Sequence, residues 1–387
     1  MATMGNMERV LRLMAEKNAS DVFISANAPV MIKINGNMVA VNPQRMTADT
    51  CLVLLKEILS EAQIEELTQF GEMNTSFALQ GVGNFRISVL RQRGTYAAVI
   101  RYIPIAIPAL DTLGLPTKTL INLVMRQRGL ILVVGATGSG KSTSLAAMLD
   151  YRNQHRSSHM LTIEDPIEFV FDNKRSIINQ REVGTDTADR QIALKNAMRQ
   201  APDVILVGEI RDRETMSAAL AYAQSGHLCL ATLHASNSYQ TLNRILTFYP
   251  EEVRETLLGD LASGLAAIIS QRLLRTLDGK RAPACEILLN TKLVSELIEK
   301  GDILGVKDAM SQSMSEGSQT FEEDIARLIQ NDVVSREEGL MHADSPTNLM
   351  WRLQNTSAEG ASNSVADVQD ESTEPQFSEI TLDMGDD

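Results

Sequence analysis

The chain has 387 residues, of which 44% are hydrophobic and only 4% aromatic, with a single Trp351. The length favours two domains and a tail, whereas the scarcity of aromatic side chains and the net charge of −13 argue against direct nucleic-acid binding. The most apolar long stretch, Leu257 to Leu274, is interrupted by polar and charged residues, so no membrane span is expected. Cys51, Cys229 and Cys285 are isolated, which argues against disulfide or zinc sites and indicates a reducing cytoplasm.

The first hundred residues predict a small α+β domain that ends near Ile103. Residues 7–17 carry apolar side chains at helical spacing, and Thr47 is placed to cap a second helix. Asn35-Gly36 lies between two short apolar runs, which is a strong hairpin signal. Further strand-like segments are expected at 21–25, 74–79, 84–90 and 95–102.

Prolines at positions 104, 108 and 116 predict a linker over residues 104–116. From Thr117 onward, short apolar strands alternate with helical segments, which is typical of a parallel α/β sheet. The expected strands are 130–134, 160–164, 203–207, 228–233 and 286–289. The expected helices are 189–200, 213–225 and 253–274, with further helices over 291–342.

Past Met341 the sequence is rich in Ser, Asp and Glu and carries −9 of the total charge. Low hydrophobicity with charge of one sign predicts disorder over residues 343–387. Within this acidic tail, 377–384 alternates apolar and acidic residues. Two interpretations of that segment stay open, a docking peptide and a solvated tail with no role beyond solubility.

The core contains a phosphate-binding loop of the pattern G-x-x-x-x-G-K-[ST], preceded by an apolar strand and followed by a helix, which is the context that confirms the motif. Its amides can cradle phosphate oxygens at a helix N-terminus. Lys141 can reach the β- and γ-phosphates of ATP, and the hydroxyl of Ser142 can hold Mg²⁺. The predicted nucleotide-binding residues are Gly135, Ala136, Thr137, Gly138, Ser139, Gly140, Lys141, Ser142 and Thr143.

Two further apolar strands end in acids. The strand 203–207 is followed by Glu209, and we expect this strand to lie beside the P-loop strand, with Glu209 near Mg²⁺ and the attacking water. The segment 162–168 holds Glu164 and Asp165 before a proline turn, so both should project from the carboxyl edge of the sheet, where ligands collect. A solvated acidic turn is the alternative for the second segment.

His227 and His234 stand at the two ends of the strand 228–233. A neutral histidine at the carboxyl end can donate a hydrogen bond to the γ-phosphate, although the residues alone favour buried structural histidines. Arg86 and Arg101 are among four arginines that crowd two strands of the first domain. They either protect a sheet edge or supply an arginine finger that neutralises charge on the transferring phosphoryl group.

Taken together and in this order, four blocks resemble the secretion-type (type II/type IV) P-loop ATPase family. They are the P-loop, an aspartate box at 162–168, a Walker B block at 203–212 and a histidine box at 226–234. Within that family the chain is similar, over about residues 7–342, to type IV pilus retraction ATPases of the PilT/PilU type.

The resemblance implies an α/β fold with a RecA-like P-loop NTPase core over 117–290. It also implies a smaller PAS-like α+β N-terminal domain over 1–103, a C-terminal helical subdomain over 291–342 and a disordered acidic C-terminal tail. Such proteins are cytoplasmic homohexamers that hydrolyse ATP with Mg²⁺ to retract pili in twitching motility. They are docked at the inner membrane on the pilus platform protein and have no membrane span.

The resemblance further implies that ATP lies between the two domains. Arg86 and Arg101 match the arginines that complete the site across a subunit interface. Glu164 and Glu209 match the two acids near the attacking water, without indicating which of them activates it. His234 and His227 match the two box histidines. The expected catalytic residues are Glu209, Glu164, Arg86, Arg101 and His234, and the expected nucleotide-binding set includes His227.

Two departures from the PilT pattern favour the PilU branch, an accessory motor that works with a PilT-type partner motor. The stretch 293–300 carries acids where the basic helix motif of PilT-type motors carries arginines, and the acidic tail is additional. Two other functions stay open. One is an adapter ring that binds ATP with little or no catalysis and assists a partner retraction motor. The other is a DNA-translocating or secretion ATPase of the same fold.

Overall fold

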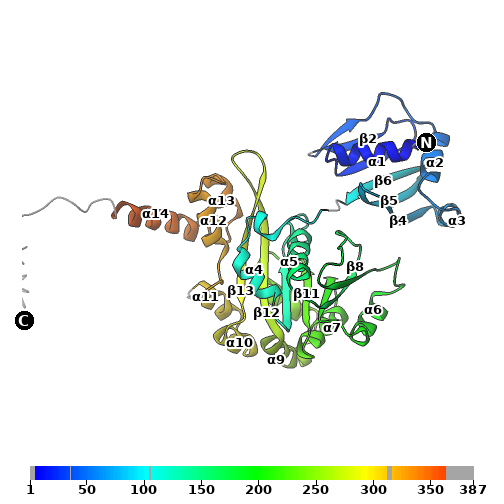
Figure 1. The fold of residues 1–387 in the computed structure, drawn as a ribbon. Helices are drawn as coiled ribbons and strands as arrows, with labels where there is room; N and C mark the ends of the chain where they lie inside the picture. The colour runs from blue at the N-terminus through cyan, green and yellow to red at the C-terminus, as the bar shows by residue number, and fades with distance from the viewer. Residues whose placement is uncertain (1–4, 35, 104–105, 312–315, 363–387) are drawn as a thin grey trace, which may run out of the picture.

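The computed structural model describes residues 5–34, 36–103, 106–311 and 316–362. Figure 1 shows two α/β bodies, each built on one sheet, joined by the segment that follows β6. The N-terminal body contains a six-stranded sheet, and the larger body contains a seven-stranded sheet. The predicted α/β fold class, with a small α+β domain ahead of a P-loop core, is therefore confirmed.

The N-terminal sheet has the order β3-β2-β1-β6-β5-β4 and is antiparallel throughout. On β5, Phe85, Ile87 and Val89 are buried at every second position, as expected of a strand with one face on the core. The hairpin predicted around Gly36 forms between β2 and β3. The strands are β1 (Asp21–Ile24), β2 (Met31–Ile34), β3 (Asn37–Ala40), β4 (Glu72–Leu79), β5 (Gly83–Gln92) and β6 (Thr95–Ile103). The helices are α1 (Asn6–Glu16), α2 (Ala48–Lys56) and α3 (Glu61–Phe70).

The core sheet has the order β13-β12-β7-β11-β10-β8-β9, with β13 antiparallel to β12 and every other pairing parallel. The central strands β7 and β11 are buried on both faces, so their side chains are apolar at consecutive positions. The strands are β7 (Gly129–Val134), β8 (His159–Glu164), β9 (Ile177–Glu182), β10 (Val204–Glu209), β11 (Leu228–Leu233), β12 (Leu265–Arg275) and β13 (Arg281–Leu289).

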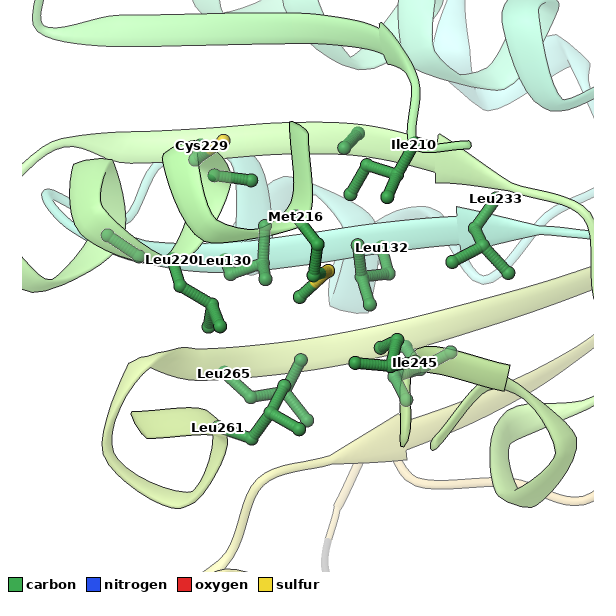
Figure 2. Packing of buried hydrophobic residues seen from close by; sticks show 14 of the residues in the cluster. Leu130, Leu132, Ile210, Met216, Leu220, Cys229, Leu233, Ile245, Leu261 and Leu265 are labelled. Atoms are coloured by element: carbon green, nitrogen blue, oxygen red, sulfur yellow. The ribbon is translucent and has the colours of Figure 1, made fainter. Parts of the chain in front are cut away.

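Helices pack on both faces of this sheet. On one face, Leu130 and Leu132 of β7 and Cys229 of β11 pack in one cluster with Met216 and Leu220 (Figure 2). The other face of β7 packs against the helix that follows the P-loop. The helices of this body are α4 (Thr117–Val124), α5 (Lys141–His155), α6 (Arg190–Ala197), α7 (Arg213–Gln224), α8 (Ser238–Thr247) and α9 (Arg254–Gly264). Short 3-10 turns are η1 (Leu110–Thr112), η2 (Met198–Gln200) and η3 (Glu251–Val253).

The position of β10 corrects one expectation. The Walker B strand was expected beside the P-loop strand, but β10 pairs with β11 and β8, and β11 separates it from β7. Strand order is a long-range property, and strands consecutive along a chain are neighbours in only about two-thirds of cases. Two strand spacings of about 4.8 Å leave roughly 10 Å between the ends of β7 and β10, which is room for a polyphosphate.

Residues 253–274 were predicted as one helix, and this was wrong. The helix α9 ends at Gly264, and the chain continues directly into β12, which pairs with β7 and β13. A continuous apolar run has no period that separates a buried helix from a buried strand. The sequence prediction also did not include β9, α3 or α8, and it began β13 at residue 286 rather than Arg281.

The C-terminal helices are α10 (Lys292–Glu299), α11 (Ile303–Ser311), α12 (Phe321–Gln330), α13 (Arg336–His342) and α14 (Pro346–Ser362). The last of them lies where disorder was predicted from residue 343 on, which is a third correction. Leu349 of α14 is fully buried against α12, and Arg352 pairs with Glu323 at 2.8 Å, so packing overrides the polar composition. The rest of the predicted tail, including 377–384, lies outside the described residues. Within the part of the chain that is described, no helix is long and apolar enough to cross a membrane.

Candidate nucleotide-binding site

The loop between β7 and α5 is shaped by glycines that no other residue can replace. Gly135 has φ +150°, and a Cβ there would lie 2.4 Å from the carbonyl oxygen of Gln271 and 2.5 Å from the Ser139 hydroxyl. Gly140 has φ +91°, and its Cβ would lie 2.8 Å from the Gln271 side-chain nitrogen. Gln271 of the neighbouring strand β12 therefore leaves no room for a Cβ at either position, and the bend requires glycine at both.

Lys141 begins α5 and is buried, with 9% of its surface exposed. Its ammonium donates to the carbonyl oxygens of Gly135 at 2.9 Å and Ala136 at 2.8 Å. Burial lowers the pKa of Lys141, and the charges of Glu209 and Glu168 oppose that shift. The ammonium therefore lies over the loop, next to the backbone amides that can bind a phosphate.

A cleft of about 510 Å³ opens on one side of this loop. The structure brings most of the predicted site residues to it, from five different elements and the loops that follow them. Its polar lining includes Arg101, Thr137, Gly138, Gly140, Lys141, Ser142, Thr143, Glu164, Asp165, Glu168, Glu209, Thr232 and His234.

A second cavity of about 340 Å³ adjoins the same loop and was not anticipated from the sequence. It is lined by the five loop residues from Gly135 to Ser139 together with Arg272, Arg281 and His342. The guanidinium of Arg272 stacks 3.9 Å from the ring centroid of Phe321. The Ser139 hydroxyl is buried and has no hydrogen-bond partner among the described residues. Such an orphaned hydroxyl is a donor available to a ligand.

Glu164 ends β8 and is 9% exposed. One of its carboxylate oxygens, Oε1, accepts hydrogen bonds from the Thr162 hydroxyl at 2.6 Å and from the Gln180 amide at 3.1 Å. Burial raises the pKa of Glu164, and these two donors oppose the shift without cancelling it. The carboxyl group is therefore a stronger base than an exposed glutamate.

Glu209 ends β10, and both of its oxygens are engaged. Oε2 lies 2.6 Å from Nη2 of Arg211, and Oε1 lies 3.1 Å from Nε2 of His234. Partial burial acts to raise the pKa of Glu209, but the hydrogen bond and charge of Arg211 outweigh it and hold the pKa below its ordinary value. The ion network continues through Asp165, which lies 3.8 Å from Arg211 and 2.7 Å from Arg190. Sequence reasoning gave no role to Arg211 or Arg190, although Arg211 stands within the Walker B block.

The two predicted arginines of the N-terminal domain differ in position. Arg101 lines the cleft of its own chain, and its Nε donates to Asp21 at 3.0 Å. Arg86 is paired opposite Arg101 in the register of β5 and β6 and is not among the cleft-lining residues in the described part of the chain. Arg101 therefore reaches the site without a neighbouring subunit, whereas the resemblance implied that both arginines arrive across an interface.

The structure does not bring His227 to the cleft of this chain, and its predicted contact with the nucleotide stays a prediction. His227 precedes β11, and its carbonyl oxygen accepts from the amide of Gly129, the first residue of β7. It therefore lies at the amino edge of the sheet, while the P-loop follows the carboxyl end of β7. Six residues of strand separate the two edges, about 20 Å. The ring of His227 instead bonds Ser225 at 3.0 Å, which agrees with a structural histidine.

Among the described residues, no three His, Cys, Asp or Glu side chains form a metal cage. The cleft nevertheless contains oxygen donors suited to Mg²⁺, namely the Ser142 hydroxyl and the Glu209 carboxylate. Mg²⁺ in nucleotide sites is usually held by one or two protein oxygens together with substrate phosphates. The donor set therefore fits a magnesium–nucleotide complex.

Comparison with known proteins agrees with this geometry. The sequence model of the family described as "Type II/IV secretion system protein" matches residues 4–354. The type IV pilus ATPase PilU of Pseudomonas aeruginosa is 43% identical over 343 residues, 88% of this chain and 90% of the relative. The pilus retraction ATPase PilT of the same organism is 36% identical over 89% of this chain and 99% of its own length.

A crystal structure of the pilus retraction motor PilT with bound ADP superposes with a TM-score of 0.83 at 39% identity. The superposition covers 89% of this chain and 98% of the PilT chain.

Proposed function

This chain belongs to the type II/IV secretion system protein family and is a P-loop ATPase of the PilT/PilU type, and on that basis we propose that it powers or assists retraction of a type IV pilus. The observation that carries the proposal is the convergence of Lys141, Glu164 and Glu209 on one cleft beside the P-loop. A phosphate anchor and two carboxylates at the carboxyl edge of a parallel sheet are the parts that hydrolysis of a γ-phosphate needs.

The loop amides and Lys141 bind the phosphates in this proposal. When a phosphate enters, the ammonium exchanges its bonds to the Gly135 and Ala136 carbonyls for bonds to phosphate oxygens. The exchange requires little motion, because Lys141 already lies across the loop. The second cavity, flanked by Arg272 and Arg281, would then receive the nucleoside.

We assign the two acids different roles. Burial gives Glu164 a raised pKa, which suits a general base that accepts the proton of the attacking water. Glu209 has a lowered pKa and stays ionised, which suits a residue that holds Mg²⁺ with Ser142 and orients the water. Bound Mg²⁺ would supply charge neutralisation for the phosphate oxygens. His234, whose Nε2 lies 3.1 Å from Oε1 of Glu209, lines the same cleft and would donate a hydrogen bond to the γ-phosphate.

We further propose that the protein acts in the cytoplasm as a homohexamer docked on the inner-membrane pilus platform protein. Arg101 connects the N-terminal domain to the nucleotide, so loss of the γ-phosphate would release that domain and move it. Greater identity to PilU than to PilT, 43% against 36%, favours the accessory branch with a PilT-type partner motor. The cleft contains both predicted catalytic acids, Glu164 and Glu209, and the P-loop residue Lys141. The non-catalytic adapter ring is therefore the weaker alternative.

The decisive experiment measures steady-state phosphate release with magnesium and ATP. Lys141→Ala should fall to background, because it removes the phosphate anchor, and Glu209→Gln should fall by about 100-fold or more. Lys280→Ala is the matched control, since this exposed lysine pairs with Asp278 on the β12–β13 hairpin and does not line the cleft in the described part of the chain. Near-normal turnover of Lys141→Ala would contradict the enzyme assignment, and background turnover of the wild type would favour the adapter.

The pilus role is tested in cells. Retraction events are counted after deletion of this protein, with and without the partner motor. A motor or accessory motor predicts fewer or weaker retractions in at least one background, and unchanged retraction in both would contradict the proposal.

A further inference from the structure

Gln180 on β9 is placed to act on the aspartate box, although no part of the four motifs includes it. The strands β8 and β9 are parallel, and Gln180 is the register partner of Thr162. Thr162 and Glu164 are two residues apart on β8 and so share a face of the sheet. The Gln180 side chain joins them there, at the end of the sheet that borders the cleft.

The primary amide of Gln180 makes three hydrogen bonds. Its nitrogen donates to Oε1 of Glu164 at 3.1 Å and to the carbonyl oxygen of Phe169 at 2.8 Å. Its oxygen accepts from the backbone amide of Phe171 at 2.9 Å. Only one orientation of the amide satisfies two acceptors and one donor in this arrangement, so the partners define which atom is nitrogen.

These contacts join two parts of the site. Phe169 and Phe171 line the same cleft as Glu164, on the loop that follows the Asp165-Pro166 turn. One side chain therefore holds both the carboxylate at the end of β8 and the loop that walls the cleft. If either the Glu164 carboxylate or the loop moved, it would lose its hydrogen bond to the Gln180 side chain, which the other partner holds in place.

We propose that Gln180 is a positioning residue for ATP hydrolysis, which fixes the Glu164 carboxylate and the 169–171 loop in one mutual arrangement. The inference rests on the proposed function, in which Glu164 is the base. Gln180 touches neither the nucleotide nor the reacting water in this assignment and acts only through Glu164 and the loop.

The electrostatics of Glu164 give this role a measurable consequence. Burial, and to a smaller extent the charge of the Glu168 carboxylate, raise the pKa of Glu164, whereas hydrogen bonds from Thr162, Gln180 and the backbone of Glu168 lower it. Removal of the Gln180 donor should raise that pKa further. A general base works only when deprotonated, so the acid limb of the rate profile should move to higher pH.

The test is single-turnover hydrolysis of ATP across a pH series, which reports the chemical step rather than product release. Gln180→Met keeps the length of the side chain and removes all three hydrogen bonds. Gln180→Glu keeps an acceptor for the Phe171 amide but replaces the donor to Glu164 with a negative charge. Ile177→Thr is the matched control, because it lies on the same strand with 61% of its surface exposed.

We expect Gln180→Met to lower the plateau rate about tenfold and to move the acid limb upward by about one pH unit. Gln180→Glu should move it further, because a second carboxylate beside Glu164 favours the protonated form. In a Glu164→Gln background, Gln180→Met should cause a smaller fold-loss than in the wild type, because the part of its effect that acts through the Glu164 base is already removed and only the loop contacts remain to be lost. Ile177→Thr should match the wild type.

Different outcomes test the positioning role of Gln180 and the proposed ATPase function. An unshifted acid limb in Gln180→Met, or an equal fold-loss with and without Glu164, would overturn the positioning role while leaving the ATPase assignment intact. Wild-type turnover no higher than that of Lys141→Ala would instead overturn the proposed function. Thermal unfolding of each variant, with binding of a fluorescent ATP analogue, distinguishes a lost fold from a lost position.

Discussion

Arg211 forms an ion pair with Glu209, which lines the cleft, and Nη2 of the arginine lies 2.6 Å from Oε2 of the glutamate. The two residues are separated by only one position, and the pair lowers the pKa of Glu209 while it raises the pKa of Arg211. The Glu209 carboxylate is thus kept charged and held to one side. A cation that enters the site must compete with the guanidinium.

Replacement of Arg211 should therefore lower both the Mg²⁺ concentration needed for half-maximal turnover and the maximal rate. Arg211→Gln removes a positive charge beside the cleft, so half-maximal turnover should need less Mg²⁺. The maximal rate should fall about tenfold, because Glu209 loses its fixed orientation. A magnesium titration of phosphate release checks both effects. Lys280→Gln makes the same charge change at an exposed position of the β12–β13 hairpin and should alter neither. A raised Mg²⁺ requirement in Arg211→Gln would refute the competition.

The two acids of the cleft should have opposite effects on stability. The folded-state pKa of Glu164 is raised, so its charge costs stability at neutral pH, and that cost fades as pH falls through this pKa toward the ordinary value. Glu164→Gln should therefore raise the melting temperature by a few degrees near pH 8 and by less near pH 5. The folded-state pKa of Glu209 is lowered, so its charge contributes stability above the ordinary value that is lost as pH falls through the lowered pKa.

Glu209→Gln should accordingly lower the melting temperature at neutral pH, with a smaller effect in acid. Thermal unfolding of both variants and the wild type at several pH values is the measurement. Effects of the same sign at neutral pH would contradict the assigned environments.

The requirement for glycine at the start of the P-loop can be tested by one methyl group. Gly135→Ala would bring a Cβ within 2.4 Å of the Gln271 carbonyl oxygen, at a φ that alanine avoids. We expect a loss of about 2 kcal/mol or more in the free energy of unfolding, together with loss of ATP-analogue binding. Gly259→Ala in α9 is the control, because nothing lies within 4 Å of its added Cβ. The control should be neutral or slightly stabilising, as helix propensity favours alanine by about 1 kcal/mol.

The position of Arg101 predicts the outcome of a subunit-mixing experiment. Arg101→Ala should reduce turnover by about 100-fold or more if this residue neutralises the transferring phosphoryl group. Because Arg101 lines the cleft of its own chain, oligomers mixed from Arg101→Ala and Lys141→Ala subunits contain no complete site. Phosphate release should stay at background in the mixture. Recovery of activity would mean that Arg101 serves a neighbouring site instead.

The local features of the fold could be predicted from the sequence, because they depend on short stretches. The Gly135 to Ser142 pattern between an apolar strand and a helix defines a backbone shape by itself, and acids that end parallel strands meet at one edge. The position of β10 could not be predicted, since no local pattern encodes which strand lies beside β7. The role of Gln180 also depends on contacts with residues 9 to 18 positions away.

The position of His227 in the sheet could have been deduced from the sequence. A residue that precedes a parallel strand lies at the edge opposite to a loop that follows its neighbour, and the sequence already placed His227 before its strand and the P-loop after its own. By contrast, the switch from helix to strand at Gly264 has no local signal, because buried helix and buried strand are equally apolar there.

The C-terminal helices are joined to the second cavity through Arg272, which stacks on Phe321 and bonds Ser236, His342 and Asp344. The backbone amide of Cys285 on β13 likewise donates to the buried carboxylate of Asp324. A chain truncated after residue 290 would lack the C-terminal partners of Arg272 and of the Cys285 amide. It would also expose the apolar side chains of β13 that the C-terminal helices cover. Anyone who trims this protein to a minimal ATPase for biochemistry should therefore keep the polypeptide at least through Asp344.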